Sequence, residues 1–222
     1  MTDFVAARRM MVDCQVRTSD VTDLRLISAM LAVARERFLP SAQQGFAYFD
    51  LDLPLAADGA GKAVRHLVKP MVLAKLIQAA EIGDGDHVLD VGCGTGYSSA
   101  LLARLAGSVV ALEEDVALAQ QAAENLRALA AGNAQVVTAP LAQGWPALHP
   151  YDAILLNGAF EAAPQALLRQ LKDGGRLVGV MHGAAGKAML YRSTGGTVSG
   201  RPIFDAAAPL LPGFAQAQAF VF

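Results

Sequence analysis

A short apolar run that breaks into three alternate glycines is the feature that most constrains this chain. Residues 88–91 read Val-Leu-Asp-Val, which is typical of a parallel strand covered on both faces. Gly92, Gly94 and Gly96 follow, and glycine permits both a positive φ and the close approach of a ligand to the backbone. Residues 97–106 then carry leucines at helical spacing. Strand, glycine turn and helix in this order predict a nucleotide-type binding unit.

The spacing of the glycines separates two classes of cofactor. A dinucleotide fingerprint needs G-x-G-x-x-G, and here Tyr97 stands where the third glycine would be, because the last glycine comes one residue early at Gly96. G-x-G-x-G preceded by an acid, here Asp90, instead resembles the first motif of S-adenosylmethionine-dependent methyltransferases. We therefore expect S-adenosylmethionine as the cofactor and S-adenosylhomocysteine as its product.

A second acid follows at the place where such a cofactor needs one. Glu113 ends the next expected strand, 108–113, and a carboxylate there can accept both ribose hydroxyls, while Asp90 can help to balance the methionine ammonium. The alternative is a purely structural glycine turn beside a solvent-facing Glu113. The expected cofactor-binding residues of this region are Asp90, Gly92, Cys93, Gly94, Thr95, Gly96 and Glu113.

Composition narrows the class of protein. With 222 residues, 54% of them hydrophobic and 17% charged, the chain is long enough for a substantial core and is not expected to be disordered. A net charge of −2 gives no electrostatic footprint for nucleic acid, and no apolar run is long enough to span a membrane, so we expect a cytoplasmic protein. Cys14 and Cys93 predict neither a disulfide framework nor a zinc site, and the four histidines have no metal-ligand spacing, so no metal is expected. Cys93 is interpreted as a small residue that fits the turn.

After the glycine turn, strands and helices alternate. The expected strands are 108–113, 134–138, 151–157 and 176–181, and the expected helices between them are 115–130 and 163–171. This pattern predicts an α/β fold with a doubly wound, mostly parallel, Rossmann-like sheet. Gly195-Gly196 predicts an antiparallel hairpin near the C-terminal end, followed by a last strand at 219–222.

The N-terminal part is expected to be helical. Two helices are predicted at 3–17 and 20–36, with Ser19 or Asp20 capping the second and Pro40 ending it. An extended segment at 46–54, a mobile loop at 56–63 and a helix at 71–80, entered through Pro70, complete this part. We expect one domain over 1–222, in which 1–70 provides helices and a covering loop that pack across the sheet edge or over the cofactor, and 71–222 forms the core.

Further short elements carry a family resemblance. They are Arg35, Phe38 and Pro40 (Arg-x-x-Phe-x-Pro); Ala47, Tyr48, Asp50, Leu53 and Pro54 (Ala-Tyr-x-Asp-x-x-Leu-Pro); and then Gly144-Trp145-Pro146, Tyr151-Asp152, Pro164, 170–172 and 174–177. With these elements in this order, nearly the whole chain resembles the protein-L-isoaspartate O-methyltransferases. The resemblance implies the class I methyltransferase fold and methyl transfer to the free carboxylate of isoaspartyl residues in damaged proteins or peptides. Because a carboxylate is already a nucleophile, no general base is required and no catalytic residue is named.

Two positions depart from the family pattern. Val68 stands where the family has a Ser whose hydroxyl binds the substrate carboxylate, and Pro140 stands where it has an Asp that recognises adenine. Backbone groups around Leu141 can still meet the adenine edge, which makes Leu141 the last expected cofactor-binding residue. Four basic residues make the segment 62–69 cationic, and either they hold a carboxylate in another way or they are simply solvated: Lys62, Arg65, His66 and Lys69.

These departures leave three hypotheses open. The first is isoaspartyl methylation; the second is a methyltransferase of the same fold with a changed acceptor; the third is a cofactor-binding module that has lost turnover. Asn157 and Trp145 are candidates to point into the crevice at the carboxyl ends of the strands, with a core or lid position as the alternative for Trp145.

Overall fold

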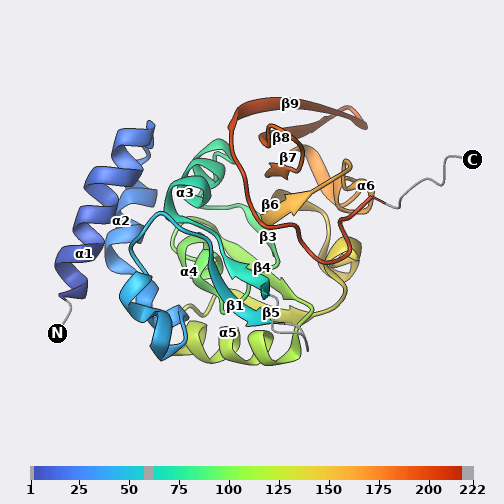
Figure 1. Ribbon diagram of the computed structural model, residues 1–222. Helices are drawn as coiled ribbons and strands as arrows, with labels where there is room; N and C mark the ends of the chain where they lie inside the picture. Colours follow the sequence, from blue (N-terminus) through green and yellow to red (C-terminus); the bar gives the residue numbers. More distant parts are fainter. Residues whose placement is uncertain (1–2, 58–62, 217–222) are drawn as a thin grey trace, which may run out of the picture.

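The computed structural model describes residues 3–57 and 63–216. Seven strands form one sheet in the order β5-β4-β3-β6-β7-β8-β9 (Figure 1), in which β3 to β7 pair in parallel and β8 and β9 are antiparallel. The strands are β3 (His87–Val91), β4 (Ser108–Glu113), β5 (Ala134–Thr138), β6 (Tyr151–Phe160), β7 (Leu171–Met181), β8 (Lys187–Thr194) and β9 (Thr197–Asp205). The expected mostly parallel sheet with an antiparallel C-terminal hairpin is therefore confirmed.

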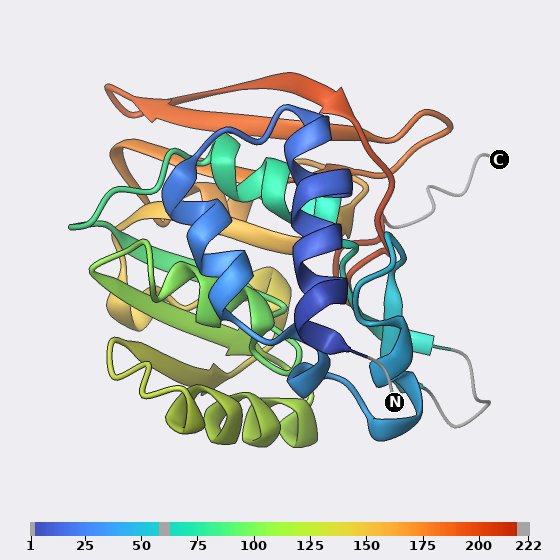
Figure 2. The ribbon, with the colours of Figure 1, turned by 90° about the vertical axis from the view of Figure 1, so that its left-hand side faces the viewer.

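Helices cover both faces of this sheet. They are α1 (Phe4–Met11), α2 (Leu24–Ala32), α3 (Pro70–Ala79), α4 (Tyr97–Leu102), α5 (Val116–Ala128) and α6 (Gln165–Leu168). Figure 2 shows α1 and α2 lying outside α3 and α4 on one face. The second face is covered by α6, by short helical turns and by the segment 209–214. Because both faces are covered, β3 and β4 are buried except at their first residues, and most of their residues are apolar.

The first predicted helix is shorter and less regular than expected. After Met11 the chain continues as a π-helical turn (Val12–Val16) and a 3₁₀ turn (Arg17–Ser19), and Asp20 then adopts a left-handed conformation with φ of 64°. A left-handed residue ends a helix, so Asp20 cannot cap the next one.

The second predicted helix begins and ends elsewhere. Asp23, rather than Ser19 or Asp20, caps α2, because its carboxylate accepts the backbone N–H groups of residues 25 and 26. The helix ends at Ala32, well before Pro40, since Val33 is already extended. The two N-terminal helices pack on the outer side of α3 and α4, not over the sheet edge.

A separate two-stranded sheet precedes α3. The predicted extended segment at 46–54 is only partly correct, because a 3₁₀ helix (Ser41–Phe46) precedes β1 (Leu53–Ala57), which pairs antiparallel with β2 (Ala63–Leu67). Figure 2 shows this β1–β2 hairpin beyond the carboxyl ends of the central strands. Most of the predicted mobile loop, residues 58–62, lies outside the described residues, and so does Lys62.

The remaining predicted elements are confirmed with changes in length. β4, β5 and α3 have nearly the predicted bounds, and Asp115 caps α5 as its carboxylate accepts two backbone N–H groups. β6 runs on past the predicted end at 157 because it pairs again with β7 after an irregularity, and α6 is confined to one turn because β7 already begins at Leu171. The predicted last strand, 219–222, lies outside the described residues. Within the described ranges, no helix is both long and apolar enough to cross a membrane.

Candidate active site

The glycine turn lies at the carboxyl ends of β3 and β4. The backbone N–H groups of Gly92 and Cys93 both donate to the carbonyl of Leu112, over 2.8 and 3.1 Å. Gly92, Gly94 and Gly96 have φ of 74°, 58° and 94°, so each occupies the left-handed region that favours glycine. The turn therefore has the backbone shape that the sequence predicts.

Thr95 and Cys93 are both buried, and their side chains make contacts within the protein. The Thr95 hydroxyl donates to the carbonyl of Phe38 over 2.7 Å, which fastens the turn to the N-terminal region. Burial and the charges of Asp90 and Glu113 raise the pKa of the Cys93 thiol well above its usual value, so the thiol stays protonated. This agrees with the interpretation of Cys93 as a small residue that fits the turn.

Glu113 points inward to the glycine turn. Its side chain is 0% exposed, and its Oε2 accepts the backbone N–H of Gly94 over 2.8 Å. Its Oε1 accepts the N–H groups of Glu114 and Asp115 over 3.0 and 3.3 Å. The alternative of a solvent-facing Glu113 is therefore wrong, and the carboxylate lies where the sequence predicts it.

Arg65, from β2, lies against the same carboxylate. Its Nε donates to Glu113 Oε1 over 3.1 Å and its Nη2 to Oε2 over 2.7 Å, and the Arg65 side chain is only 4% exposed. For Arg65, the idea that the basic segment 62–69 is simply solvated is wrong. The sequence contains a faint signal of this, because Arg65 lies with His66 inside a short segment that is otherwise apolar, 63–68. Arginine is exposed by default, however, and its buried partner lies 48 residues away.

Asp90 is the centre of a buried polar cluster at the end of β3. Its Oδ2 accepts the hydroxyls of Ser98 and Ser99 over 2.7 and 2.5 Å, and its Oδ1 accepts the Asn157 amide. Burial raises the pKa of Asp90 to about 6, although these three hydrogen bonds oppose the shift. Asn157 thus points toward the crevice residues as expected, whereas the roles of Ser98 and Ser99 were missed, because serines at a helix start normally act as caps.

Arg35, the first residue of the Arg-x-x-Phe-x-Pro element, organises the segment before α3. It is wholly buried; its Nε donates to the carbonyl of Ala47 over 2.8 Å and its Nη2 to that of Val68 over 2.9 Å. Its guanidinium lies 4.9 Å from the centre of the Tyr97 ring, at the start of α4. This element therefore joins the approach to α3 to the helix that follows the glycine turn.

Asp50 and Asp52 accept hydrogen bonds from backbone N–H groups at the start of α3, about twenty residues later in the sequence. Asp50 accepts the N–H of Met71 over 3.1 Å, and Asp52 accepts that of Lys69 over 2.9 Å, which satisfies groups that a helix start leaves free. Val68 is buried next to them, and its side chain offers no donor. The position where the resemblance expects a Ser is thus held firmly in place from both sides.

Leu141, Pro140 and Trp145 lie after β5. The Leu141 side chain is fully buried in the hydrophobic core on the face of the sheet that α6 and the segment 209–214 cover, and its N–H donates to Glu114 Oε2 over 3.3 Å. The Leu141 carbonyl accepts the N–H of Gly144 over 3.1 Å, so both backbone polar groups of Leu141 are paired within the protein in this conformation. Trp145 is half-buried and packs against the same core, which favours the alternative of a core or lid position over one that points into the crevice.

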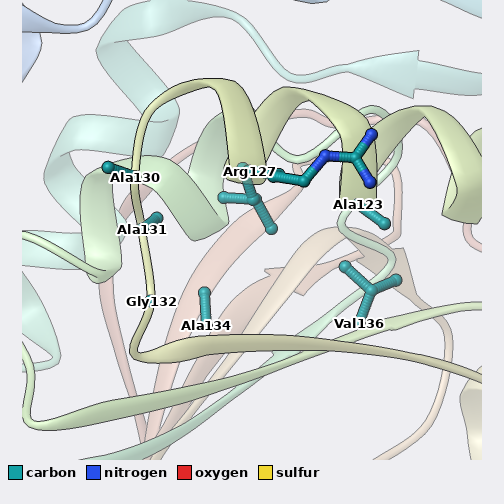
Figure 3. A pocket seen from close by; sticks show the side chains of 8 residues that line it. Ala123, Arg127, Ala130, Ala131, Gly132, Ala134 and Val136 are labelled. Carbon is teal, nitrogen blue, oxygen red and sulfur yellow. The ribbon is translucent and has the colours of Figure 1, made fainter.

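One groove lies beside the glycine turn, and another lies apart from it. One, of about 500 Å³, is lined by Val64, His66 and the segment 209–215, and Leu211 also lies against the glycine turn. Another, of about 490 Å³, lies between the second half of α5 and the amino end of β5 (Figure 3), away from the turn. Among the described residues there is no group of three or more His, Cys, Asp or Glu side chains that could hold a metal ion.

The profile of one protein family, Protein-L-isoaspartate(D-aspartate) O-methyltransferase (PCMT), matches residues 7–201. This chain belongs to that family. Two relatives are Protein-L-isoaspartate O-methyltransferase 1 of Rhodopseudomonas palustris, 41% identical over 177 residues, and the Protein-L-isoaspartate O-methyltransferase of Methylorubrum populi, 39% identical over 194 residues. The first alignment covers 80% of this chain and 70% of the relative, and the second covers 87% of both.

Solved structures of PCMT proteins share the fold. One protein-L-isoaspartate O-methyltransferase superimposes with a TM-score of 0.80 at 24% identity, over 93% of this chain and 66% of the other. A Plasmodium falciparum protein assigned to the same family, solved in complex with S-adenosyl-L-homocysteine, gives a TM-score of 0.75 at 18% identity, over 95% of this chain and 99% of the other. The PCMT family belongs to the S-adenosylmethionine-dependent methyltransferases, so the class I methyltransferase fold and the class of cofactor are both as expected.

The residue types around the glycine turn are suitable for binding S-adenosylmethionine. A buried carboxylate, Glu113, lies beside the turn, and the three glycines have left-handed φ. In this conformation, however, the protein's own side chains lie against the turn: a Cβ built on Gly94 would be 2.6 Å from Leu55 Cδ1, and one built on Gly92 would be 2.9 Å from Arg65 Nη2. Side chains of β1 and β2 therefore cover the glycine turn in this conformation.

Proposed function

We propose that this protein transfers the methyl group of S-adenosylmethionine to the free carboxylate of isoaspartyl residues in proteins or peptides. The observation that carries the proposal is the position of Glu113, which is buried at the end of β4 and bound to the N–H of Gly94. The family match over residues 7–201 supports the choice of acceptor. The net charge of −2 likewise favours a protein or peptide over a nucleic acid as the partner.

Each cofactor-binding residue has a role in this proposal. Glu113 accepts the ribose hydroxyls, which are a good match for a carboxylate with two oxygens. Glycines at 92, 94 and 96 let the backbone approach the bound molecule. Asp90 favours the methionine ammonium through its negative charge, since its oxygens already accept three side-chain donors. The backbone at Leu141 meets the adenine edge.

The chemistry asks little of the protein beyond binding and orientation. S-adenosylmethionine, when bound, supplies a methyl group on a positively charged sulfur that leaves as a neutral thioether. The acceptor carboxylate needs no deprotonation at neutral pH, because its pKa is about 4. Holding two reactants in line in a site shielded from water can contribute about 7–11 kcal/mol.

The groove beside the glycine turn is the place we assign to the acceptor. It is lined by Val64, His66 and the segment 209–215, and Leu211 joins it to Gly92. Burial and the nearby Arg65 charge lower the pKa of His66, so this imidazole is neutral at physiological pH, and its Nδ1 has no hydrogen-bond partner among the residues that the structure describes. A neutral imidazole in this position can exchange a hydrogen bond with a peptide backbone.

A methyl-transfer assay with matched peptides tests the proposal. The purified protein is incubated with methyl-labelled S-adenosylmethionine and either an isoaspartyl peptide or the same sequence with a normal aspartate, beside a family enzyme as positive control. We expect a base-labile methyl ester on the isoaspartyl peptide only. No label on that peptide, while the control enzyme methylates it, would reject the proposal.

A second candidate function has one specific observation in its favour. Val68 offers no hydroxyl, and Arg65 presents a cation to the crevice, so the acceptor-binding groups differ from the family pattern. A methyltransferase with a changed carboxylate acceptor has the same cofactor site. Label that appears on another protein or metabolite in a cell extract, and not on isoaspartyl peptides, would favour this candidate.

A further inference from the structure

The carboxylate of Glu113 is saturated with donors in this conformation. A carboxylate offers about four lone-pair sites. Glu113 already accepts the backbone N–H groups of Gly94, Glu114 and Asp115, and two further hydrogen bonds come from Arg65. The backbone donors belong to the turn and to the start of α5 and stay in place. A ribose diol can therefore bind Glu113 only after Arg65 has left it.

Arg65 can leave because it belongs to a unit that is separate from the main sheet. The β1–β2 hairpin forms its own two-stranded sheet, and within the described part of the chain no backbone ladder connects it to the seven-stranded sheet. An isolated two-stranded hairpin has little stability of its own and depends on its side-chain contacts. Here those contacts include Leu55 against Gly94 and Arg65 against Glu113. Displacement of these two side chains uncovers the glycine turn.

Once displaced, Arg65 needs another anion. A buried or half-buried guanidinium without an acceptor is costly. The acceptor of the proposed reaction is itself a carboxylate, with the same planar pair of oxygens that Arg65 holds in Glu113. Leu211, which lines the groove assigned to that acceptor, lies against the same glycine as Arg65: a Cβ built on Gly92 would be 3.1 Å from Leu211 Cδ2 and 2.9 Å from Arg65 Nη2.

We propose that Arg65 is the residue that binds the acceptor carboxylate, and that the cofactor releases it for this role by taking over Glu113. In this arrangement Glu113 stands in for the substrate while the crevice is closed. Arg65 replaces the hydroxyl donor that Val68 cannot provide, with two hydrogen bonds in place of one. The proposal rests on the proposed function for the identity of the acceptor, and it predicts that the cofactor binds before the acceptor.

Two binding measurements on three proteins test it. Wild type, Arg65→Gln and Lys69→Gln are compared by calorimetry, first with S-adenosylhomocysteine alone and then with an isoaspartyl peptide added to the protein saturated with S-adenosylhomocysteine. Lys69→Gln removes a positive charge from the same segment without touching the ion pair, so it serves as the matched control. Thermal unfolding of each variant shows whether it is folded.

The expected effects of Arg65→Gln have opposite signs. S-adenosylhomocysteine should bind about tenfold more tightly, because its competitor for Glu113 is gone, whereas the peptide should bind about ten- to a hundredfold more weakly, because two charge-assisted hydrogen bonds are lost. At saturating cofactor, the KM for the peptide should rise by a similar factor. Lys69→Gln should change either affinity by less than about threefold, because the half-buried Lys69 side chain makes no ion pair among the described residues.

Other outcomes overturn the proposal. If Arg65→Gln weakens both ligands, the arginine is a structural part of the cofactor site. If it tightens S-adenosylhomocysteine and leaves peptide binding unchanged, the arginine only covers the crevice. A wild-type protein that binds S-adenosylhomocysteine but no isoaspartyl peptide would reject the proposed function and, with it, the acceptor role of Arg65. The competition between Arg65 and the cofactor for Glu113 is tested separately, by the affinity of Arg65→Gln for S-adenosylhomocysteine.

Discussion

Arg65 and Glu113 form a two-point ion pair at the mouth of the crevice, with N to O distances of 3.1 and 2.7 Å and almost no exposure to solvent. This pair joins the β1–β2 hairpin to the last residue of β4. It also determines how the protein responds when either partner is changed, since a buried charge without its partner is costly.

A double-mutant cycle should reveal this coupling. Glu113→Gln leaves a buried guanidinium without a counter-ion and should lower the free energy of unfolding by about 3–5 kcal/mol. Arg65→Gln should cost less, because three backbone N–H groups still solvate Glu113. The double variant should be more stable than Glu113→Gln alone. Chemical denaturation of the four proteins measures this, and strictly additive effects would show that the pair is not coupled.

Asp90 should make stability depend on pH in a defined direction. Its folded pKa of about 6 lies above the ordinary value of 3.8, so the folded state binds a proton that the unfolded state lacks between these pH values. The ionised carboxylate therefore costs stability at neutral pH, and the cost shrinks as the pH falls through 6 toward 4. A shift on the order of two pKa units corresponds to a few kcal/mol. The difference in unfolding free energy between wild type and Asp90→Asn should change by about that amount over this pH range. If the difference in unfolding free energy between the two proteins does not change with pH, the raised pKa of Asp90 is contradicted.

Replacement of Gly96 by alanine should lower stability more than the same replacement at Gly195, another glycine with a positive φ. Gly96→Ala and Gly195→Ala both place a side chain in the left-handed region, at φ of 94° and 57°, which costs about 1–2 kcal/mol each. A Cβ at Gly96 would also lie 3.3 Å from both Cα and Cβ of Ala122 on α5, whereas nothing lies within 4 Å of one at Gly195. Gly96→Ala should therefore cost on the order of 1–3 kcal/mol more. Equal losses in thermal or denaturant unfolding would show that α5 gives way freely.

Val68→Ser should restore the donor of the family pattern. We expect this variant to methylate an isoaspartyl peptide at least as well as wild type, by up to about tenfold, because a hydroxyl can add one hydrogen bond to a carboxylate. Val72→Ser, a buried valine on α3, is the matched control: it should lose stability without any gain in activity. Steady-state kinetics on the three proteins decides this. A clear loss of activity in a folded Val68→Ser protein would mean that the alignment of this segment is wrong.

The sequence predicted the parts of the site that local chemistry determines. Glycine spacing, the acid at Asp90 and the strand that ends at Glu113 are all confined to short segments, and the structure brings them together at the carboxyl ends of β3 and β4. These features need only a strand period, a turn that favours glycine and the rule that parallel strands end at one edge.

The parts that were missed depend on contacts between distant segments. Arg65 is paired with Glu113, which lies 48 residues away in the sequence, and Asp90 accepts a hydrogen bond from Asn157, which lies 67 residues away. No local pattern encodes such contacts, and the default for arginine is exposure. The end of α1 and the cap of α2 were misplaced for a related reason: Ser19, Asp20 and Asp23 are all good caps, and only packing against α3 and α4 selects Asp23.

The most direct test of the account is a crystal structure of the protein with S-adenosylhomocysteine. We predict that both ribose hydroxyls lie within hydrogen-bond distance of the Glu113 carboxylate, about 2.6–3.2 Å, and that Arg65 has moved away from it. A complex in which the ligand binds elsewhere while Arg65 stays paired with Glu113, or in which Glu113 has turned to solvent, would contradict the assignment of this crevice as the cofactor site.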